Sequence, residues 1–368
     1  MKQTEARIAL AHPFIGDEEK QAVMRVLESG QLAQGPVVAE FEEAFAAWCG
    51  VKHAVAVSSG TAGLHLALLA HGIAEGAEVI TTPFTFIASA NAILFTGATP
   101  VFADVEPDTF CLDPELVEAA ITPRTRALLP VHLYGQAAAM PELVEIASRH
   151  RLLVIEDAAQ AHGATVNGKK VGALGNTAVF SLYPTKNITS GEGGFVTTDD
   201  DAIAASVRML RQHGESERYH HQVLGYNFRM TDICAAIGLA QLHRLDAFNA
   251  ARRRNAQVLT AGLDGISGLV APAERHGYGH VYHQYTVRVE RGRDELRTAL
   301  TDRGIGTGVY YPIPVHRQPV YESRGYGELS FPVAERLSDE VLSLPVHPAL
   351  TEGDLARIVR TVREEMSR

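Results

Sequence analysis

The chain has 368 residues, 46% of them hydrophobic and 21% charged, which is the balance of an ordinary globular protein with room for one large and one small domain. Its formal net charge of −10 opposes binding to nucleic acid or to an anionic membrane surface, so we expect neither as a partner. Three widely spaced cysteines predict no disulfide framework, and the N-terminus lacks the apolar run of a signal peptide, so we expect a cytoplasmic protein.

The first two-thirds of the chain alternates short apolar runs with helical patterns, which is typical of an α/β domain around a largely parallel sheet. The expected strands cover 53–58, 78–82, 100–104, 127–133, 152–156, 177–181 and 194–198. The expected helices cover 17–29, 36–49, 62–71, 114–120, 141–150 and 200–213.

The pattern changes near Thr231, which can cap a long helix over about 231–263. The elements expected after it are a strand over 282–289, a helix over 293–302, a strand over 306–311 and a terminal helix from Thr351. These elements predict a small α+β domain over 241–368, which the long helix joins to a large domain over 1–240.

A Ser-Ser-Gly-Thr-Ala turn at 58–62 separates an expected strand from an expected helix. Such a turn presents free backbone N–H groups and a hydroxyl, and the positive end of the helix dipole adds to their attraction for an anion. The same residues can simply cap a helix, so the turn by itself leaves both interpretations open. It contains neither a Walker pattern nor G-x-G-x-x-G, which disfavours a dinucleotide fold or nucleotide-driven phosphoryl transfer.

Asp157 follows the expected strand over 152–156. It therefore lies at the carboxyl edge of an α/β sheet, where ligands bind. A carboxylate in such a place needs a cationic partner, and a protonated pyridine nitrogen would be one. A cap for the next helix explains this aspartate equally well.

Lys186 lies between an expected strand and a glycine-rich turn, in F-S-L-Y-P-T-K-N-I-T-S-G-E-G-G. Tyr183, Pro184 and the rigid turn would hold its amine inward, where a partly desolvated lysine can form a Schiff base. A lone loop lysine is usually a surface residue, so the order of the three features decides the interpretation. A phosphate turn, an aspartate for a ring nitrogen and a Schiff-base lysine are the anchors that pyridoxal phosphate needs.

With these motifs the sequence resembles the DegT/DnrJ/EryC1/StrS family of pyridoxal-phosphate-dependent sugar aminotransferases. The resemblance runs nearly end to end, from G-Q-L-A-Q-G-P to the C-terminal helix. It implies fold type I, an α/β fold with a large, mostly parallel mixed sheet flanked by helices and a small C-terminal α+β domain. It also implies a homodimer whose active sites lie at the interface.

The resemblance assigns the cofactor contacts through S-S-G-T-A-G-L, T-P-F-T-F-I-A-S-A-N-A-I, I-E-D-A-A-Q-A-H-G-A and the lysine loop. The implied contacts are Gly60, Thr61, Ala62 and Ser181 at the phosphate, Phe86 stacked on the ring, Gln160 on the ring hydroxyl, Asp157 on the ring nitrogen and Lys186 as the Schiff-base lysine. Many relatives carry Trp where this chain has Phe86, and Phe keeps the stacking with a smaller face.

The remaining contacts implied by the resemblance concern the substrate and a second subunit. G-Y-N-F-R-M-T-D is similar to a segment that crosses the dimer interface, which implies Asn227 at the neighbour's phosphate and Arg229 near the neighbour's substrate. G-V-Y-Y-P-I-P-V-H-R-Q-P-V-Y resembles the substrate loop, which implies Tyr310, Tyr311 and His316 near the sugar nucleotide.

The implied reaction is a ping-pong transfer of an amino group from glutamate or glutamine to a nucleotide-linked keto sugar, with pyridoxamine phosphate as the intermediate form of the cofactor. Lys186 would carry the proton between the substrate carbon and the cofactor. Relatives with His in its place act as dehydratases, so lysine favours transamination. The short P-I-P-V-H-R-Q-P loop resembles those of 3-amino sugar enzymes, which favours a 3-keto sugar.

Alternative functions stay open at this point. The substrate could be a cyclitol or an aminobenzoate precursor, or the chain could be a non-enzymatic regulatory member of the family. The histidines in H-G-E-S-E-R-Y-H-H suggest a metal site as an alternative. Their spacing fits no helical pair of ligands, so we expect no metal.

Overall fold

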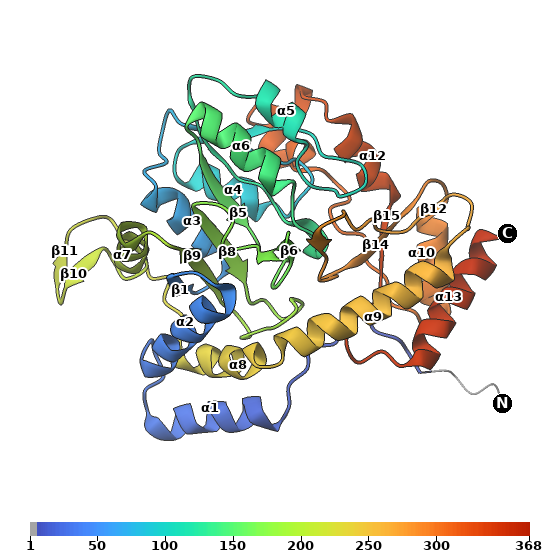
Figure 1. Ribbon diagram of the computed structural model, residues 1–368, viewed down its shortest axis with the longest axis horizontal. Helices are drawn as coiled ribbons and strands as arrows, with labels where there is room; N and C mark the ends of the chain where they lie inside the picture. The colour runs from blue at the N-terminus through green and yellow to red at the C-terminus, as the bar shows by residue number, and fades with distance from the viewer. Residues whose placement is uncertain (1–5) are drawn as a thin grey trace.

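A seven-stranded mixed sheet lies at the centre of the computed structural model, which describes residues 6–368 (Figure 1). Its strands, in the order β1-β9-β8-β5-β4-β2-β3, are β1 (His53–Val57), β9 (Gly194–Thr198), β8 (Thr177–Ser181), β5 (Leu153–Asp157), β4 (Thr125–Leu128), β2 (Glu78–Thr81) and β3 (Thr99–Phe102). Strand β9 is antiparallel to both neighbours, whereas every other pairing away from β9 is parallel. The prediction of an α/β fold with a mostly parallel sheet is confirmed. Residues 1–5 lie outside the described residues. They are part of the expected large domain and of the N-terminal stretch in which the sequence analysis looked for a signal peptide.

Eight longer helices accompany this part of the chain in residues 6–242. They are α1 (Asp17–Ser29), α2 (Pro36–Cys49), α3 (Gly60–Ala70), α4 (Ala88–Phe95), α5 (Pro114–Ala119), α6 (Met140–His150), α7 (Asp201–Leu210) and α8 (Asp232–Leu242). Side-chain caps begin several of them: the Ser59 hydroxyl accepts from the Ala62 N–H, and the Thr231 hydroxyl accepts from the Cys234 N–H. The sequence analysis did not predict helix α4. Its sequence, Ala-Ser-Ala-Asn-Ala-Ile-Leu-Phe, has no clear amphipathic face, and the helix has no side-chain cap.

The long helix expected over 231–263 is wrong in one respect, because the structure divides it into α8 and α9 (Leu245–Leu263). The two residues between them are a turn, and the second, Arg244, reaches back to α1. Its guanidinium pairs with Glu18 at 2.7 Å and lies 4.8 Å from the Phe14 ring centroid. The apolar period continues through the break, so a periodicity argument does not detect it.

The C-terminal part contains a three-stranded antiparallel sheet in the order β12 (Leu269–Val270), β14 (Tyr285–Val289) and β15 (Val341–Leu344). Its helices are α10 (Arg293–Asp302), α12 (Pro332–Glu340) and α13 (Glu352–Met366). The strand expected over 306–311 is wrong: only Gly308 forms an isolated bridge there, to Ser343. The strand that pairs with β14 at this edge is β15, and the sequence analysis did not predict it.

Short elements complete residues 6–368. They are β6 (Thr165–Val166), β7 (Lys169–Lys170), β10 (Glu215–Glu217), β11 (His220–His221), β13 (Tyr278–Gly279), η1 (Leu133–Gly135), η2 (Val315–Arg317), α11 (Pro319–Glu322) and η3 (Tyr326–Glu328). The β10–β11 hairpin projects from the side of the molecule opposite α13 (Figure 1).

Four apolar clusters lie within residues 6–368, and two of them are large. The larger lies on both faces of the seven-stranded sheet and includes Phe45, Phe180 and Phe195. The smaller is built from α9, β14, α10, β15 and α13, and Ile8 from the N-terminal segment joins it. The division at residues 240 and 241 stays a prediction.

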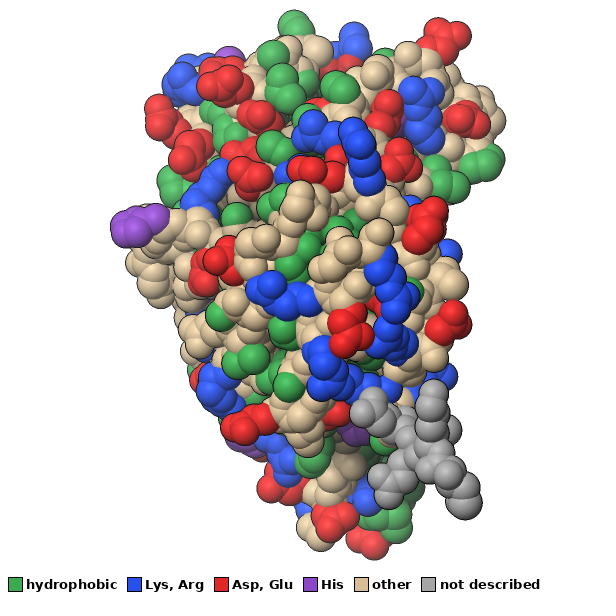
Figure 2. Space-filling model, turned by 90° about the vertical axis from the view of Figure 1, so that its right-hand side faces the viewer, with side chains coloured by type: hydrophobic (Ala, Val, Ile, Leu, Met, Phe, Trp, Pro, Cys, Tyr) green, Lys and Arg blue, Asp and Glu red, His purple; other side chains and the backbone are tan. Residues whose placement is uncertain are grey.

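The surface is mixed in charge on the side where α10 and α13 lie, with basic and acidic side chains interspersed rather than gathered in one patch (Figure 2). Within residues 6–368, no helix combines the length and apolar character needed to cross a bilayer.

The parallel arrangement brings chemically important loops to one edge of the sheet. Strands β1, β5 and β8 all end there, and the antiparallel β9 begins there. The turn after β1, Asp157 at the end of β5 and Ser181 at the end of β8 therefore meet at the carboxyl edge, where α/β sheets bind ligands.

Candidate active site

A cavity of about 570 Å³ opens at this edge of the sheet. The predicted site residues that line it are Gly60, Thr61, Phe86, Asp157, Gln160, Ser181, Lys186, Tyr310 and Tyr311. They come from the ends of, and the loops after, four strands of the large sheet, β1, β2, β5 and β8, and from the segment that leaves α10. Residues far apart in the sequence thus share one concave site, as a ligand pocket requires.

The turn after β1 forms the N-terminus of α3. Gly60 and Thr61 are its first residues, so their backbone N–H groups have no intrahelical partner and face an anion readily. Gly60 is needed for close packing, since a Cβ there would lie 2.9 Å from the Ser181 Cβ. Ala62 differs from the prediction in its surroundings: its N–H is held by the Ser59 hydroxyl at 3.1 Å, and it does not line the cavity.

Asp157 is 4% exposed and has two donors in the chain. The Ser89 hydroxyl donates to Oδ2 at 2.7 Å, and the Ala159 N–H donates to Oδ1 at 3.2 Å. Burial raises the pKa of this carboxyl above its usual value, and the Ser89 hydrogen bond is the largest effect that opposes the rise. A cation placed in the cavity beside Asp157 would stabilise the carboxylate further.

Lys186 lies in the loop after β8, where its N–H donates to the Tyr183 carbonyl at 2.9 Å. Loss of solvent lowers the pKa of its amine from 10.5 to about 8, although the negative charge of Asp157 acts in the opposite direction. Most of the amine is still charged near physiological pH, but the neutral fraction is far larger than in an ordinary lysine. The neutral amine is the form that attacks a carbonyl carbon or accepts a proton.

Gln160 joins two tyrosines across the cavity. Its Oε1 accepts from the Tyr134 N–H at 2.9 Å, and its Nε2 donates to the Tyr311 hydroxyl at 2.7 Å. Tyr134 and Tyr311 have φ values of 56° and 64°, and their rings stack at 6.3 Å. Positive φ angles raise the conformational energy of bulky residues, and such strained residues are common at functional sites.

Phe86 stands at the edge of the cavity with 58% of its surface exposed. It precedes α4, and its carbonyl accepts from the Ser89 N–H at 3.2 Å. An exposed aromatic ring at a cavity edge is free to stack on a planar ligand.

Besides Ala62, three further predicted residues lie apart from the cavity wall of their own chain. Asn227 and Arg229 flank Phe228, whose carbonyl accepts from the Ser58 N–H at 2.8 Å, so their segment runs beside the start of the phosphate turn. His316 is buried, with its Nε2 3.0 Å from Glu335 and its ring against Phe331.

The structure also adds cavity residues that sequence reasoning missed. Ser89, Tyr134, His283, Gln284, Thr85 and Glu192 all line the cavity. Only Ser89 and Thr85 carried a signal: they are four residues apart at the start of α4, and their hydroxyls lie 3.1 Å from each other. His283 and Tyr134 come from segments with no motif, so only the fold places them.

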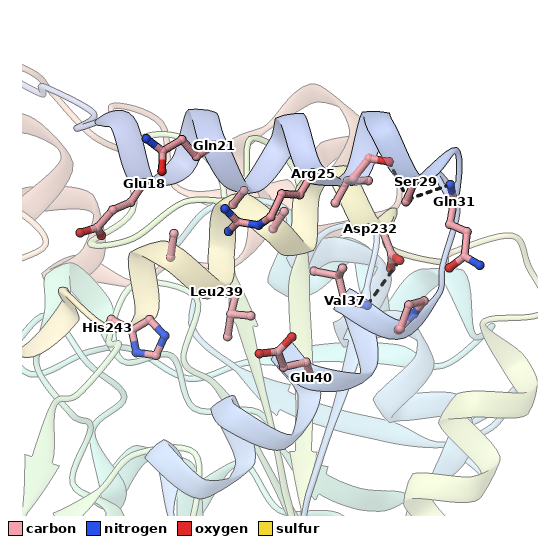
Figure 3. A pocket seen from close by; sticks show the side chains of 15 residues that line it. Glu18, Gln21, Arg25, Ser29, Gln31, Val37, Glu40, Asp232, Leu239 and His243 are labelled. Carbon is pink, nitrogen blue, oxygen red and sulfur yellow. Dashed lines mark hydrogen bonds between the residues drawn. The ribbon is translucent and has the colours of Figure 1, made fainter.

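A second groove of about 580 Å³ runs between α1, α2 and α8, and it brings together none of the predicted site residues (Figure 3). Asp232 accepts there from the Gly35 and Val38 N–H groups at 2.8 and 3.0 Å, so it holds the start of α2. In residues 6–368, no three His, Cys, Asp or Glu side chains cluster as metal ligands would.

Comparison with protein families identifies one match. The profile of the DegT/DnrJ/EryC1/StrS aminotransferase family matches residues 13–363. This match spans nearly the whole chain and includes every residue of the cavity wall.

Individual proteins resemble the chain over comparable lengths. It is 46% identical to the dTDP-3-amino-3,4,6-trideoxy-alpha-D-glucose transaminase of Streptomyces venezuelae, over 96% of this chain and 93% of the relative. It is 45% identical to a pleiotropic regulatory protein of Geobacillus stearothermophilus, over 95% of each chain. Among solved structures, S. venezuelae DesV in complex with a ketimine intermediate is 46% identical, with a TM-score of 0.93 over 96% of this chain and 95% of DesV.

Proposed function

The chain belongs to the DegT/DnrJ/EryC1/StrS aminotransferase family, and we propose that it transfers an amino group from glutamate or glutamine to C3 of a nucleotide-linked keto sugar. The observation that carries the proposal is the shared cavity of the Lys186 amine, the Asp157 carboxylate and the N-terminus of α3. The similar transaminase of S. venezuelae, whose name specifies a 3-amino sugar bound to dTDP, supports the substrate class.

The residues present fit pyridoxal phosphate. The first N–H groups of α3 and the Ser181 hydroxyl would hold its phosphate, and the buried Asp157 carboxylate would hold its protonated ring nitrogen. Phe86 would stack on the ring, and Lys186 would hold the aldehyde carbon covalently. When bound, the cofactor supplies a carbon that takes up the amino group and a ring that accepts the electrons released with the α-proton.

The chain's own contribution to the reaction is the movement of protons. Asp157 would keep a proton on the ring nitrogen, because its carboxylate would be the charged partner of that atom. The Lys186 Nζ, with its pKa lowered to about 8, would accept the proton that leaves the substrate carbon and could give it to the cofactor carbon on the other side of the amino nitrogen. The nine cavity-lining residues from the prediction would surround both substrates in turn, as a ping-pong reaction requires.

The sugar would contact the Tyr310 and Tyr311 side of the cavity. Burial raises the pKa of both phenols, so they stay neutral and can donate hydrogen bonds to sugar oxygens. His316 lies behind this loop against Glu335, and we propose that it supports the nucleotide side of the site.

A homodimer would complete the site. Lys186 is the one Lys or Arg side chain on the cavity wall among residues 6–368, whereas the proposed substrates bring a phosphate, a diphosphate and carboxylates. Asn227 and Arg229 of a second subunit would supply the missing donors. All three cysteines are free, which supports the proposed reducing, cytoplasmic environment.

The relative named as a regulatory protein favours a second candidate, a regulatory role without turnover. The two candidates differ in what Lys186 must do. A regulator needs no neutral amine beside a buried carboxylate, whereas a transaminase needs both.

The test is a half-reaction followed by absorbance. The protein is charged with pyridoxamine phosphate and mixed with dTDP-3-keto, dTDP-4-keto or cyclitol ketone acceptors. The 3-keto sugar nucleotide should restore the visible band of the lysine-bound cofactor. Restoration by the cyclitol ketone alone would refute the nucleotide-sugar proposal, and no response to any acceptor would favour the regulatory role.

A further inference from the structure

Ser89 is the one side chain within residues 6–368 that donates a hydrogen bond to Asp157. Its Oγ lies 2.7 Å from Asp157 Oδ2, and the serine is 1% exposed. The same oxygen is 3.2 Å from the Phe86 carbonyl and 3.1 Å from the Thr85 hydroxyl. A serine has one proton to donate, and the shortest of these contacts is to the only ionised acceptor. The proton therefore goes to the carboxylate.

Thr85 completes a chain of hydroxyls. Because the Ser89 proton is used by Asp157, the Thr85 hydroxyl must be the donor in its contact with the Ser89 oxygen. Thr85 is also buried, at 4% exposed. The two side chains lie on the segment that presents Phe86 to the cavity, so one short segment carries both the proposed ring-stacking residue and the hydrogen-bond donor of the carboxylate.

We infer that Ser89 is a positioning residue for the amino transfer, holding the Asp157 carboxylate ionised and aimed at the cofactor ring nitrogen. This inference rests on the proposed function. Ser89 binds Oδ2 and the Ala159 N–H binds Oδ1, so both oxygens are fixed in orientation while each keeps a free lone pair. Without the hydroxyl, a buried carboxylate that burial already disfavours loses a charge-assisted donor.

Loss of the Ser89 hydroxyl should change the protonation of Asp157 in one direction. Removing the hydroxyl shifts Asp157 toward its protonated form, which cannot pair with a protonated ring nitrogen. The step in which the α-proton leaves should slow, whereas the donor's affinity should stay the same, because Ser89 touches the carboxylate rather than the donor. The loss should be larger at low pH, since more of the Asp157 carboxyl is then protonated.

The test uses the full-length holoenzyme and a single turnover with glutamate, followed at the band of the lysine-bound cofactor. Ser89→Ala and the nearly isosteric Ser89→Cys should slow the turnover by about 10- to 100-fold with an unchanged glutamate KM. Ser89→Thr should restore most of the rate. Thr96→Val is the matched control and should react as the wild type does, because it removes a hydroxyl at the other end of α4 that donates to the Ile93 carbonyl and accepts from the Ala98 N–H.

The Asp157→Asn background separates positioning from packing. In that background Ser89→Ala should cause less than about a twofold further loss, because the charged acceptor is gone. Wild-type rates in Ser89→Ala and Ser89→Cys, or an equal loss in both backgrounds, would overturn the inference. Failure of the proposed function would look different, since the wild-type protein itself would then form no visible band or show no response to any amino donor.

Discussion

Lys186 is the residue to which the proposal assigns most of the chemistry, and this role can be tested by removing its side chain. Lys186→Ala should abolish turnover while still binding pyridoxamine phosphate, because the α3 N-terminus, Ser181 and Asp157 remain in place. Turnover and cofactor binding can be measured separately, by product formation and by dialysis equilibrium. Full activity in this variant would refute the assignment of Lys186.

The lowered pKa of Lys186 predicts how the rate of cofactor uptake depends on pH. Its pKa is lowered to about 8 mainly by desolvation, so below that pH the amine is mostly charged and unreactive. Uptake of pyridoxal phosphate by the apo-protein should therefore speed up from about pH 7 to about pH 9 and then level off, which stopped-flow absorbance can follow. A rate that keeps rising to the ordinary range of lysine near pH 10.5 would contradict the lowered pKa.

Asp157 can be tested without removing its shape. Asp157→Asn should still bind the cofactor through Lys186 but lose most of the turnover, by roughly 100-fold or more, because an amide cannot keep the ring nitrogen protonated. Steady-state kinetics beside the absorption spectrum measure the two properties. Wild-type kinetics would argue against this role.

At the level of elements, α3 and β8 pack closely against each other where they line the cavity. A Cβ on Gly60 would lie 2.9 Å from the Ser181 Cβ, so Gly60→Ala must push apart the two loops proposed to hold the phosphate. We expect the cofactor Kd to rise about 10-fold or more, which fluorescence titration can measure. Gly353→Ala in α13 is the matched control, since its nearest neighbour is 3.7 Å away. Equal cofactor affinity in the two variants would show that the contact between α3 and β8 is not the phosphate site.

The elements around the cavity were predictable from the sequence because the central strands are short apolar runs that end at polar residues. Asp157 was placed at the carboxyl edge by its strand alone, whereas Ser181, which also ends a strand, was assigned only through the family resemblance. The segment from Gly306 to Tyr311 misled the prediction: its alternating side chains resemble a strand, but it pairs only through Gly308. The positive φ values of Tyr134 and Tyr311 could not be predicted from the sequence. Both residues make long-range hydrogen bonds to Gln160, which only the fold brings close to them.

At the scale of the whole molecule, the proposed site needs two chains. Lys186 lies in the cavity of its own chain, whereas Arg229 does not line it. If Arg229 acts across a dimer interface, Lys186→Ala and Arg229→Ala proteins should each be inactive or weak. After subunit exchange, the mixture should recover up to about a quarter of the wild-type activity, because half of the dimers are mixed and each has one intact site.

The control for this complementation is either variant mixed with itself, which should gain nothing. No recovery despite demonstrated exchange would place Lys186 and Arg229 in the same subunit's site. A protein that stays monomeric at assay concentrations would contradict the shared site as well.

The central claim, amino transfer to a nucleotide-linked sugar, is tested most directly by following the nitrogen atom. The holoenzyme is incubated with ¹⁵N-glutamate and the dTDP-3-keto sugar, and the sugar nucleotide is analysed by mass spectrometry. The account predicts an amino sugar nucleotide that carries the ¹⁵N label, with none formed by Lys186→Ala. Retention of all label in glutamate, with the keto sugar unchanged, would contradict it.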